Sequence, residues 1–430
     1  MKKIILSATI TAAISLSGCS FGTSIDNLMA PPKLSVEQEQ VYNTIKDTAG
    51  QNVRLKYPKS GNYLSSFIIE DIDDDGGNEA IVFYEKTGFT SDETNLRINI
   101  LDQVGGKWRS VCDTPAEGSE IEKVSISKLG DNEHTNIIIG TSILNRSEKK
   151  AAIYNYDSAD GTITKNFSSP YTYMDILDLD SDGNNELFLL SGSTDSYAEA
   201  FAYKLSSDGK YHVYSTKLSE GFTEFDNVVY GSIDDERNGL YIDALSGTGT
   251  IQTEIIYMGS QGLKNVLAES QNNISTVRPS GCNTVDIDGD GIYEIPVQSL
   301  FPGYSESDEN EQIKMTNWLY FKDNALIKKC SSYYSISDGY AFIIPDNWLG
   351  KVSVKLDTLN DEIVFYKLSD QKELLKIYTA EDSASREDRI TAGYQIVHSK
   401  GEAYHLVYVE NEDELSISTG ELALYFKYIN

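Results

Sequence analysis

The feature that most limits the fold is an acidic nine-residue turn that occurs three times. DIDDDGGNE starts at Asp71, DLDSDGNNE at Asp178 and DIDGDGIYE at Asp286, so 107 and 108 residues separate the starts. Two like charges about 4 Å apart repel by roughly 4 kcal/mol at an effective dielectric near 20. Each turn must therefore either splay its carboxylates into solvent or hold a cation. Two nearly equal intervals also suggest a repeat of half that length, with degenerate copies between.

The segments after the turns support a shorter repeat. Residues 80–84 and 187–190 are continuously apolar, and similar runs follow Asn136 and Gly239. Counting back gives five turns, which start at residues 71, 128, 178, 231 and 286. Continuous apolar runs are typical of strands covered on both faces. Each unit contains an approach strand, the turn, the apolar strand and two further strands, which matches one propeller blade.

The D-x-D-x-D-G-x-x-E turns and their apolar strands resemble the FG-GAP and VCBS repeats of integrin-type β-propellers. The resemblance covers roughly residues 62–337. It implies an all-β fold, a β-propeller of about five four-stranded blades. A sixth, unmarked blade is also compatible with the sequence, and residues 51–57 offer a strand to close the ring.

The spacing of the acidic residues suits Ca²⁺. Positions 1, 3, 5 and 9 carry carboxylates, Gly76 at position 6 permits the sharp bend, and position 7 offers a backbone carbonyl. Ca²⁺ accepts six to eight oxygen ligands in irregular geometry. The predicted ligands are Asp71, Asp73, Asp75, Gly77 and Glu79; Asp178, Asp180, Asp182, Asn184 and Glu186; and Asp286, Asp288, Asp290, Ile292 and Glu294. We expect about three structural Ca²⁺ ions.

Two alternatives compete with this interpretation. An EF-hand needs Glu at position 12 and flanking helices, but position 12 is Val82, Leu189 or Val297 and strands follow. A solvated polar hairpin turn is the second alternative, since Asp and Gly are common in turns. The degenerate turns lack the ligands, and we expect both to be metal-free; their equivalent residues are Lys128, Gly130, Asn132 and Asn136, and Gly231, Ile233, Asp235 and Gly239.

The start of the chain indicates export. Lys2 and Lys3 precede a short apolar run over residues 4–14, and residues 16–19 read LSGC. This resembles the bacterial lipoprotein cleavage box. The resemblance implies a signal peptide over residues 1–18, a lipid on Cys19, a tether over residues 19–34 and anchoring on the extracytoplasmic face of a bacterial membrane. An ordinary signal peptide with an incidental Cys is the alternative.

Two other regions flank the repeats. Ser35 and Gln38 form a capping-box pattern that predicts a helix over residues 35–49, within a lead-in region of residues 35–61. Residues 338–430 lack the acidic turn and predict a small β-rich domain with room for one helix. Its expected strands are 351–356, 362–367, 374–378, 393–398, 403–409 and 422–428.

Three cysteines follow the lipid box, Cys112, Cys282 and Cys330. We expect buried thiols, with a disulfide between Cys282 and Cys330 as the alternative.

Composition narrows the function. A formal net charge of −30 argues against binding of nucleic acid. The four histidines, His134, His212, His398 and His405, form no H-E-x-x-H motif, and the chain has no G-x-S-x-G elbow.

We therefore expect a surface lipoprotein that binds an extracellular protein or glycan without catalysis. One alternative is a carbohydrate-active hydrolase or lyase that uses two carboxylates in the propeller cleft. Another is an assembly factor of the periplasm or wall, whose partner surface would be an exposed apolar patch.

Overall fold

The structure is a computed structural model that describes residues 34–86, 96–131, 134–143, 147–269, 274–305, 312–410 and 413–429. The predicted signal peptide, Cys19, the tether up to residue 33, and Asn132 of the second turn lie outside the described residues. Within the described ranges, no helix combines the length and the apolar character that crossing a bilayer requires.

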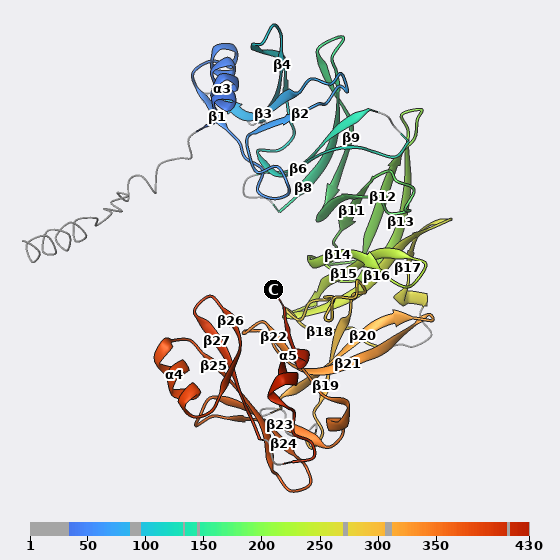
Figure 1. Cartoon of the computed structure of the whole chain (residues 1–430). Helices are drawn as coiled ribbons and strands as arrows, with labels where there is room; N and C mark the ends of the chain where they lie inside the picture. Colours follow the sequence, from blue (N-terminus) through green and yellow to red (C-terminus); the bar gives the residue numbers. More distant parts are fainter. Residues whose placement is uncertain are drawn as a thin grey trace, which may run out of the picture.

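The first element is the predicted helix, α3 (Val36–Ala49). The Ser35 hydroxyl accepts from the Gln38 amide, the Gln38 side chain accepts from the Ser35 amide, both at 3.1 Å, and Gly50 ends the helix. Val41 and Ile45 are fully buried against the first sheet. The prediction for residues 35–49 is therefore confirmed, and the helix covers the outer face of that sheet (Figure 1).

Five antiparallel sheets follow in chain order, each built from strands consecutive in sequence except for one strand added to the fifth from the end of the chain. The first contains β2 (Phe67–Glu70), β3 (Glu79–Lys86), β4 (Leu96–Gln103) and β5 (Trp108–Pro115). The second contains β6 (Glu120–Lys128), β7 (Thr135–Ser142), β8 (Lys149–Asp157) and β9 (Thr162–Tyr171). The third contains β10 (Tyr173–Leu177), β11 (Glu186–Ser191), β12 (Tyr197–Leu205) and β13 (Tyr211–Glu220).

The fourth and fifth sheets keep this plan with additions. The fourth contains β14 (Phe225–Ser232), β15 (Asn238–Gly247), β16 (Thr250–Gly259) and β17 (Gly262–Asn265), with β18 (Arg278–Pro279) beside β16. The fifth contains β19 (Ile295–Leu300), β20 (Lys314–Lys322), β21 (Ala325–Ser335) and β22 (Tyr340–Ile343). Its approach strand is reduced to a bridge between Val285 and Glu294. The first four predicted turns lie between the first and second strands of their sheets, as expected, and the fifth lies between the two residues of the bridge before β19.

The sheets stack face to face along an arc, in the manner of propeller blades (Figure 1). Successive side chains of β7 pack against the sheets on its two sides. Ile137 and Ile139 contact the first sheet, and Ile138 contacts the third. Equivalent clusters join the third sheet to the fourth and the fourth to the fifth. Burial of each such side chain stabilises the fold by about 1.5–3 kcal/mol. The all-β propeller of about five blades is confirmed, and the continuous apolar runs are explained.

The lead-in strand differs from its predicted role. β1 (Val53–Leu55) pairs with β3, opposite residues 84–86. It therefore belongs to the first sheet and does not pair with the last one. The sequence could not distinguish these partners because a three-residue strand carries no register information of its own.

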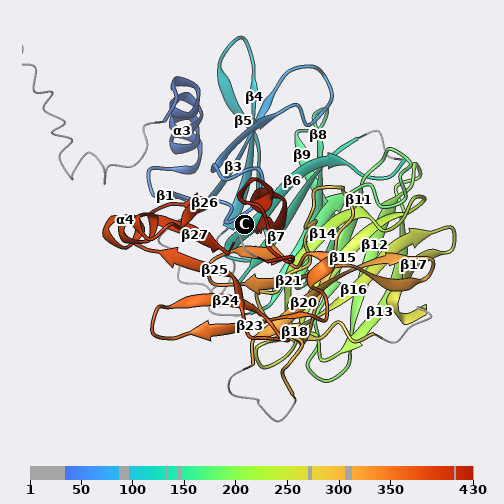
Figure 2. The same cartoon turned by 60° about the horizontal axis from the view of Figure 1, so that its bottom comes forward.

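The C-terminal region forms a sixth sheet that packs next to the fifth (Figures 1 and 2). Its strands are β23 (Val352–Asp357), β24 (Glu362–Lys367), β25 (Glu373–Ala380), β26 (Gln395–Lys400) and β27 (Ala403–Val409), with α4 (Ser383–Thr391) between β25 and β26.

The end of the chain returns to the fifth sheet. The expected strand over residues 422–428 is wrong in its first half, because α5 (Leu422–Tyr425) precedes β28 (Phe426–Tyr428). β28 pairs with β22, so the fifth sheet takes in two strands from beyond residue 338. Backbone hydrogen bonds thus tie the chain segments before and after the sixth sheet, β22 and β28, to the propeller.

A fully buried ion pair anchors the connection between the fourth and fifth sheets. Arg278 donates to Asp243 Oδ1 at 2.7 Å, and both side chains are fully buried. Arg278 also donates to the hydroxyls of Thr253 and Thr284, and the Thr284 amide donates to Asp243 Oδ2. Every charge has several partners, which is the condition under which burial of a pair is tolerated.

We predict that Arg278→Met destabilises the protein by about 3–5 kcal/mol, because the Asp243 carboxylate is left buried without its counter-charge. Urea unfolding followed by tryptophan fluorescence measures this change. Lys210→Met is the control: Lys210 pairs with Asp208, its side chain is 79% exposed, and its loss leaves the midpoint unchanged. Equal effects of the two substitutions would contradict the prediction.

Candidate metal sites

The three acidic turns share one internal scaffold, centred on the glutamate at position 9. Glu79 Oε2 accepts the Ile72 amide, Glu186 Oε2 the Leu179 amide and Glu294 Oε2 the Ile287 amide, each at 2.9 Å. These glutamates begin or directly precede β3, β11 and β19, and they are 2%, 0% and 0% exposed. The same backbone bond therefore fixes the same carboxylate at the base of each turn.

The aspartate at position 1 closes each turn around a glycine. Asp71 Oδ2 accepts the Gly76 amide at 3.0 Å, and Asp178 and Asp286 accept from Gly183 and Gly291 at 2.9 and 2.8 Å. The three glycines have φ of 90°, 91° and 88°, a region that side chains with a Cβ rarely adopt.

The aspartate at position 5 holds the residue at position 7. Asp75, Asp182 and Asp290 each accept the amide of the predicted carbonyl donor, which is Gly77, Asn184 and Ile292 respectively. Strands follow all three turns, so the EF-hand alternative is wrong.

Each turn brings three of its predicted carboxylates together. Ligand-type oxygens lie within 4.8 Å of one another in three sets: Asp71, Asp73 and Glu79; Asp178, Asp180 and Glu186; Asp286, Asp288 and Asp290. Among the described residues, acidic groups converge in this way only at these turns. Asp75, Asp182 and Glu294 lie in the same turns but outside these sets.

Several of these oxygens lack a hydrogen-bond donor. Asp71 Oδ1 and Glu186 Oε1 are buried and accept no hydrogen bond from the described residues, although Lys204 Nζ lies 3.6 Å from Glu186 Oε1. A buried carboxylate oxygen without a partner is costly, and a cation removes that cost. The donor set consists only of oxygens, the ligand type that Ca²⁺ prefers, so these residues fit the ion.

Burial also changes the protonation of the glutamates. Burial raises the pKa of Glu79, Glu186 and Glu294 to about 7. For Glu79, the nearby charges of Asp73, Asp102 and Asp75 also raise the pKa. The hydrogen bond from the Ile72 amide lowers it by stabilising the ionised form. A bound divalent cation would favour the ionised form instead.

Two lysines that sequence reasoning missed reach into the turns. Lys204, on β12, lies 2.7 Å from Asp180 Oδ2 and also contacts Asp182. Lys329, on β21, lies 2.8 Å from Asp288 Oδ1, 2.6 Å from Asp290 Oδ2 and 2.8 Å from Glu294 Oε1. The hairpins that bring these lysines to the turns differ in length, so spacing in the sequence gave no signal.

The second turn is closed by amides. Lys128 does not enter its own turn but pairs with Asp74 of the first turn at 2.9 Å. Asn136, at the glutamate position, is fully buried and accepts from Asn155 Nδ2 at 2.9 Å. A Cβ on Gly130 would lie 2.1 Å from the carbonyl oxygen of Leu205, so only glycine fits.

The fourth turn is closed by an ion pair between Asp234 and Arg237. Gly239 replaces the glutamate, and a Cβ there would lie 2.3 Å from the carbonyl oxygen of Ile256. This turn therefore has no room for a side chain at position 9.

The cysteines and histidines have structural surroundings. Cys112, Cys282 and Cys330 are free thiols, so the disulfide alternative is wrong; the expected burial is confirmed for Cys282, whereas the other two are half-buried. His405 is 1% exposed and stacks in parallel with Tyr428 and His398. Burial lowers the pKa of His405, which favours the neutral form.

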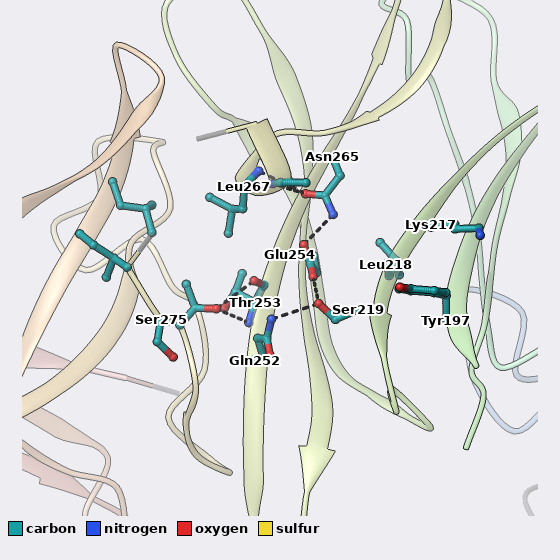
Figure 3. A pocket seen from close by; sticks show the side chains of 14 residues that line it. Tyr197, Lys217, Leu218, Ser219, Gln252, Thr253, Glu254, Asn265, Leu267 and Ser275 are labelled. Carbon is teal, nitrogen blue, oxygen red and sulfur yellow. Dashed lines mark hydrogen bonds between the residues drawn. The ribbon is translucent and has the colours of Figure 1, made fainter. Parts of the chain in front are cut away.

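The cavity between the third and fourth sheets argues against a carboxylate pair there. It measures about 480 Å³ and is lined by Tyr197 and Lys217 on one side and Glu254 on the other (Figure 3). Glu254 is the one carboxylate among its described lining residues. Its oxygens accept from Ser219 at 2.5 Å and Asn265 at 2.6 Å, so both are engaged in holding neighbouring strands together.

A second cavity, of about 470 Å³, lies where the fourth, fifth and sixth sheets meet. Asp338 and Glu381 both line it, together with Lys400 and Tyr334. Two carboxylates in one cavity are the minimum that glycoside hydrolysis requires. This cavity is therefore one place where the hydrolase alternative can be tested.

Comparison with known proteins identifies no family. No family model and no curated protein matches the chain. Among solved structures, Sqt1 of Saccharomyces cerevisiae is similar with a TM-score of 0.31 and 10% identity, over 75% of this chain and 76% of that one. A similarity this weak supports no inference about function.

We predict that the chelated protein loses stability as pH rises from about 4.5 to about 7. The three glutamates have folded pKa values near 7, above the ordinary value of 4.5. Protons are therefore bound preferentially by the folded state, and their contribution is complete below pH 4.5 and lost through pH 7. Melting in EDTA across this range measures it. A variant with all three changed to Gln should lack this component; an unchanged profile would contradict the assignment.

Proposed function

We propose that this protein is a lipid-anchored, calcium-stabilised propeller on the extracytoplasmic face of a bacterial membrane, where it binds an extracellular protein or glycan. The observation that carries the proposal is the common scaffold of the three acidic turns, in which one backbone amide holds a buried glutamate and three carboxylates converge. The resemblance to FG-GAP and VCBS repeats and the LSGC box ending at Cys19 support the same conclusion.

Ca²⁺ would be held by the carboxylates at positions 1, 3, 5 and 9 of each turn and would supply two positive charges to groups that otherwise repel. The protein's own contribution is positional: position 6 bends the chain, and position 9 is fixed by the amide of position 2. The ions serve stability, because each turn joins the first two strands of a blade.

Two features support the binding role: the structural surroundings of the acidic and histidine clusters, and the lining of the cavity beside Asp338 and Glu381. In the described part of the chain, the acidic clusters form strand connections and the histidine stack packs against the last strand. The cavity beside Asp338 and Glu381 offers both charges and an aromatic ring, a combination that suits a polar ligand such as a glycan.

We expect calcium to raise the melting temperature of the chelated protein by several degrees or more, because each ion offsets repulsion among buried carboxylates. The triple variant Asp71→Asn, Asp178→Asn and Asp286→Asn should lose this rise. The matched control is Asp157→Asn, Asp208→Asn and Asp357→Asn, three hairpin aspartates that accept backbone amides outside the acidic turns. A chelator that leaves the wild-type melting temperature unchanged would sink the calcium proposal.

Cys19→Ser tests the anchor. We expect the wild-type protein to incorporate labelled palmitate and to sediment with membranes, and the variant to do neither. Cys112→Ser is the control, since that thiol is half-buried in β5. Labelling of the Cys19→Ser variant would show that the lipid box has been misidentified.

Binding without catalysis is tested on the released protein. We expect a glycan array and an envelope-protein screen to give saturable binding, and polysaccharide substrates to remain intact by reducing-end analysis. Turnover that Asp338→Asn or Glu381→Gln abolishes would favour the hydrolase alternative.

A further inference from the structure

We infer that the three calcium sites are not equivalent: Asp102 makes the first turn the strong site, whereas Lys204 and Lys329 are built-in cations that compete with calcium in the third and fifth turns. This inference rests on the proposed calcium binding and concerns its order and regulation. It follows from the charges that face each turn from neighbouring strands.

The strand opposite position 9 supplies the first difference. In the first sheet Ala80 pairs with Leu101, so the register places Glu79 opposite Asp102. In the third sheet Leu187 pairs with Tyr203, so the same register places Glu186 opposite Lys204. Equivalent positions thus carry a negative charge in one blade and a positive charge in the other.

The fifth turn receives its lysine from a different strand. The register there places Tyr320 opposite Glu294. A register shift after Trp318 leaves Lys329 as an extra residue of β21, between Lys328 and Cys330. Its ammonium contacts Asp288, Asp290 and Glu294. Two unrelated positions therefore deliver the same charge to equivalent turns.

In the part of the chain that the structure describes, no lysine or arginine forms an ion pair with Asp71, Asp73, Asp75 or Glu79 of the first turn. Glu79 faces Asp102, so five acidic groups gather here when Asp102 is counted with positions 1, 3, 5 and 9, against four acids and one lysine at each of the other two turns. The nearby Lys128 pairs with Asp74, at position 4 of the turn. Asp71 Oδ1 is buried without a hydrogen-bond donor, and Glu79 is 2% exposed and accepts the Ile72 amide at its Oε2. This turn therefore has one buried carboxylate oxygen without a donor, three converging carboxylates, and the largest negative charge to neutralise.

The consequence is a graded response to calcium. An ion entering the third or fifth turn must first displace an ammonium group that makes short contacts with two or three carboxylates. An ion entering the first turn displaces none. At low calcium the first turn is loaded while Lys204 and Lys329 keep the other two turns closed, so those blades keep their shape without metal.

Calcium titration by calorimetry on the chelated protein tests the inference. We expect one ion to bind at least tenfold more tightly than the other two. In the double variant Lys204→Met and Lys329→Met, the two weaker sites should tighten at least tenfold while the first is unchanged. Lys210→Met is the control and should match the wild type, because Lys210 is an exposed lysine in the turn between β12, which carries Lys204, and β13.

The reciprocal substitution keeps the test decisive if the lysine variants fold poorly. Asp102→Lys should abolish the tight ion and leave the two weaker ones. Three equal affinities in the wild type, lysine variants without tightening, or an Asp102→Lys variant that keeps the tight ion would each overturn the inference while calcium binding itself stands. No calcium bound by any variant would instead overturn the proposed function.

Discussion

The structure depends on one repeated interaction, the bond from the backbone amide at position 2 of an acidic turn to the buried glutamate at position 9. This bond recurs at 2.9 Å in three blades. It places a carboxylate where strands begin and solvent is excluded. The ionised form of that buried carboxylate is costly unless a positive charge lies nearby. Fold and chemistry are coupled here, because the glutamate at the start of the strand is also one of the proposed ligands of the ion.

The blades without the glutamate show the other solutions to the same problem. Asn136 forms a chain of neutral amides with its neighbours, and Gly239 removes the side chain altogether. In the third and fifth blades a lysine stands among the acids. One backbone turn is thus compatible with a metal, an amide chain, an ion pair or an ammonium group, and neighbouring strands decide which of them applies.

The sequence predicted that the blades pack on one another, but it did not predict which elements cover the first and last sheets. Runs such as residues 80–84 are apolar at every position, and a strand of this kind needs cover on both faces. The sequence predicted that much, along with the five turns and the helix over residues 35–49. It did not show that α3 covers the outer face of the first sheet, where Val41 and Ile45 take the place of another blade. Nor did it show that β28 returns to β22, because pairing across about 80 residues leaves no local pattern.

By itself, the sequence determined the repeat, the all-β class and the positions of the acidic clusters, because these follow from local spacing and from the polarity of single strands. Only the tertiary structure decided which charge faces each carboxylate cluster. Asp102, Lys204 and Lys329 reach their turns through strand register and a bulge, and register depends on hairpin length and on neighbouring sheets. The sequence therefore showed where negative charge is concentrated. The fold determined at which of these clusters a lysine of the same chain neutralises part of that charge.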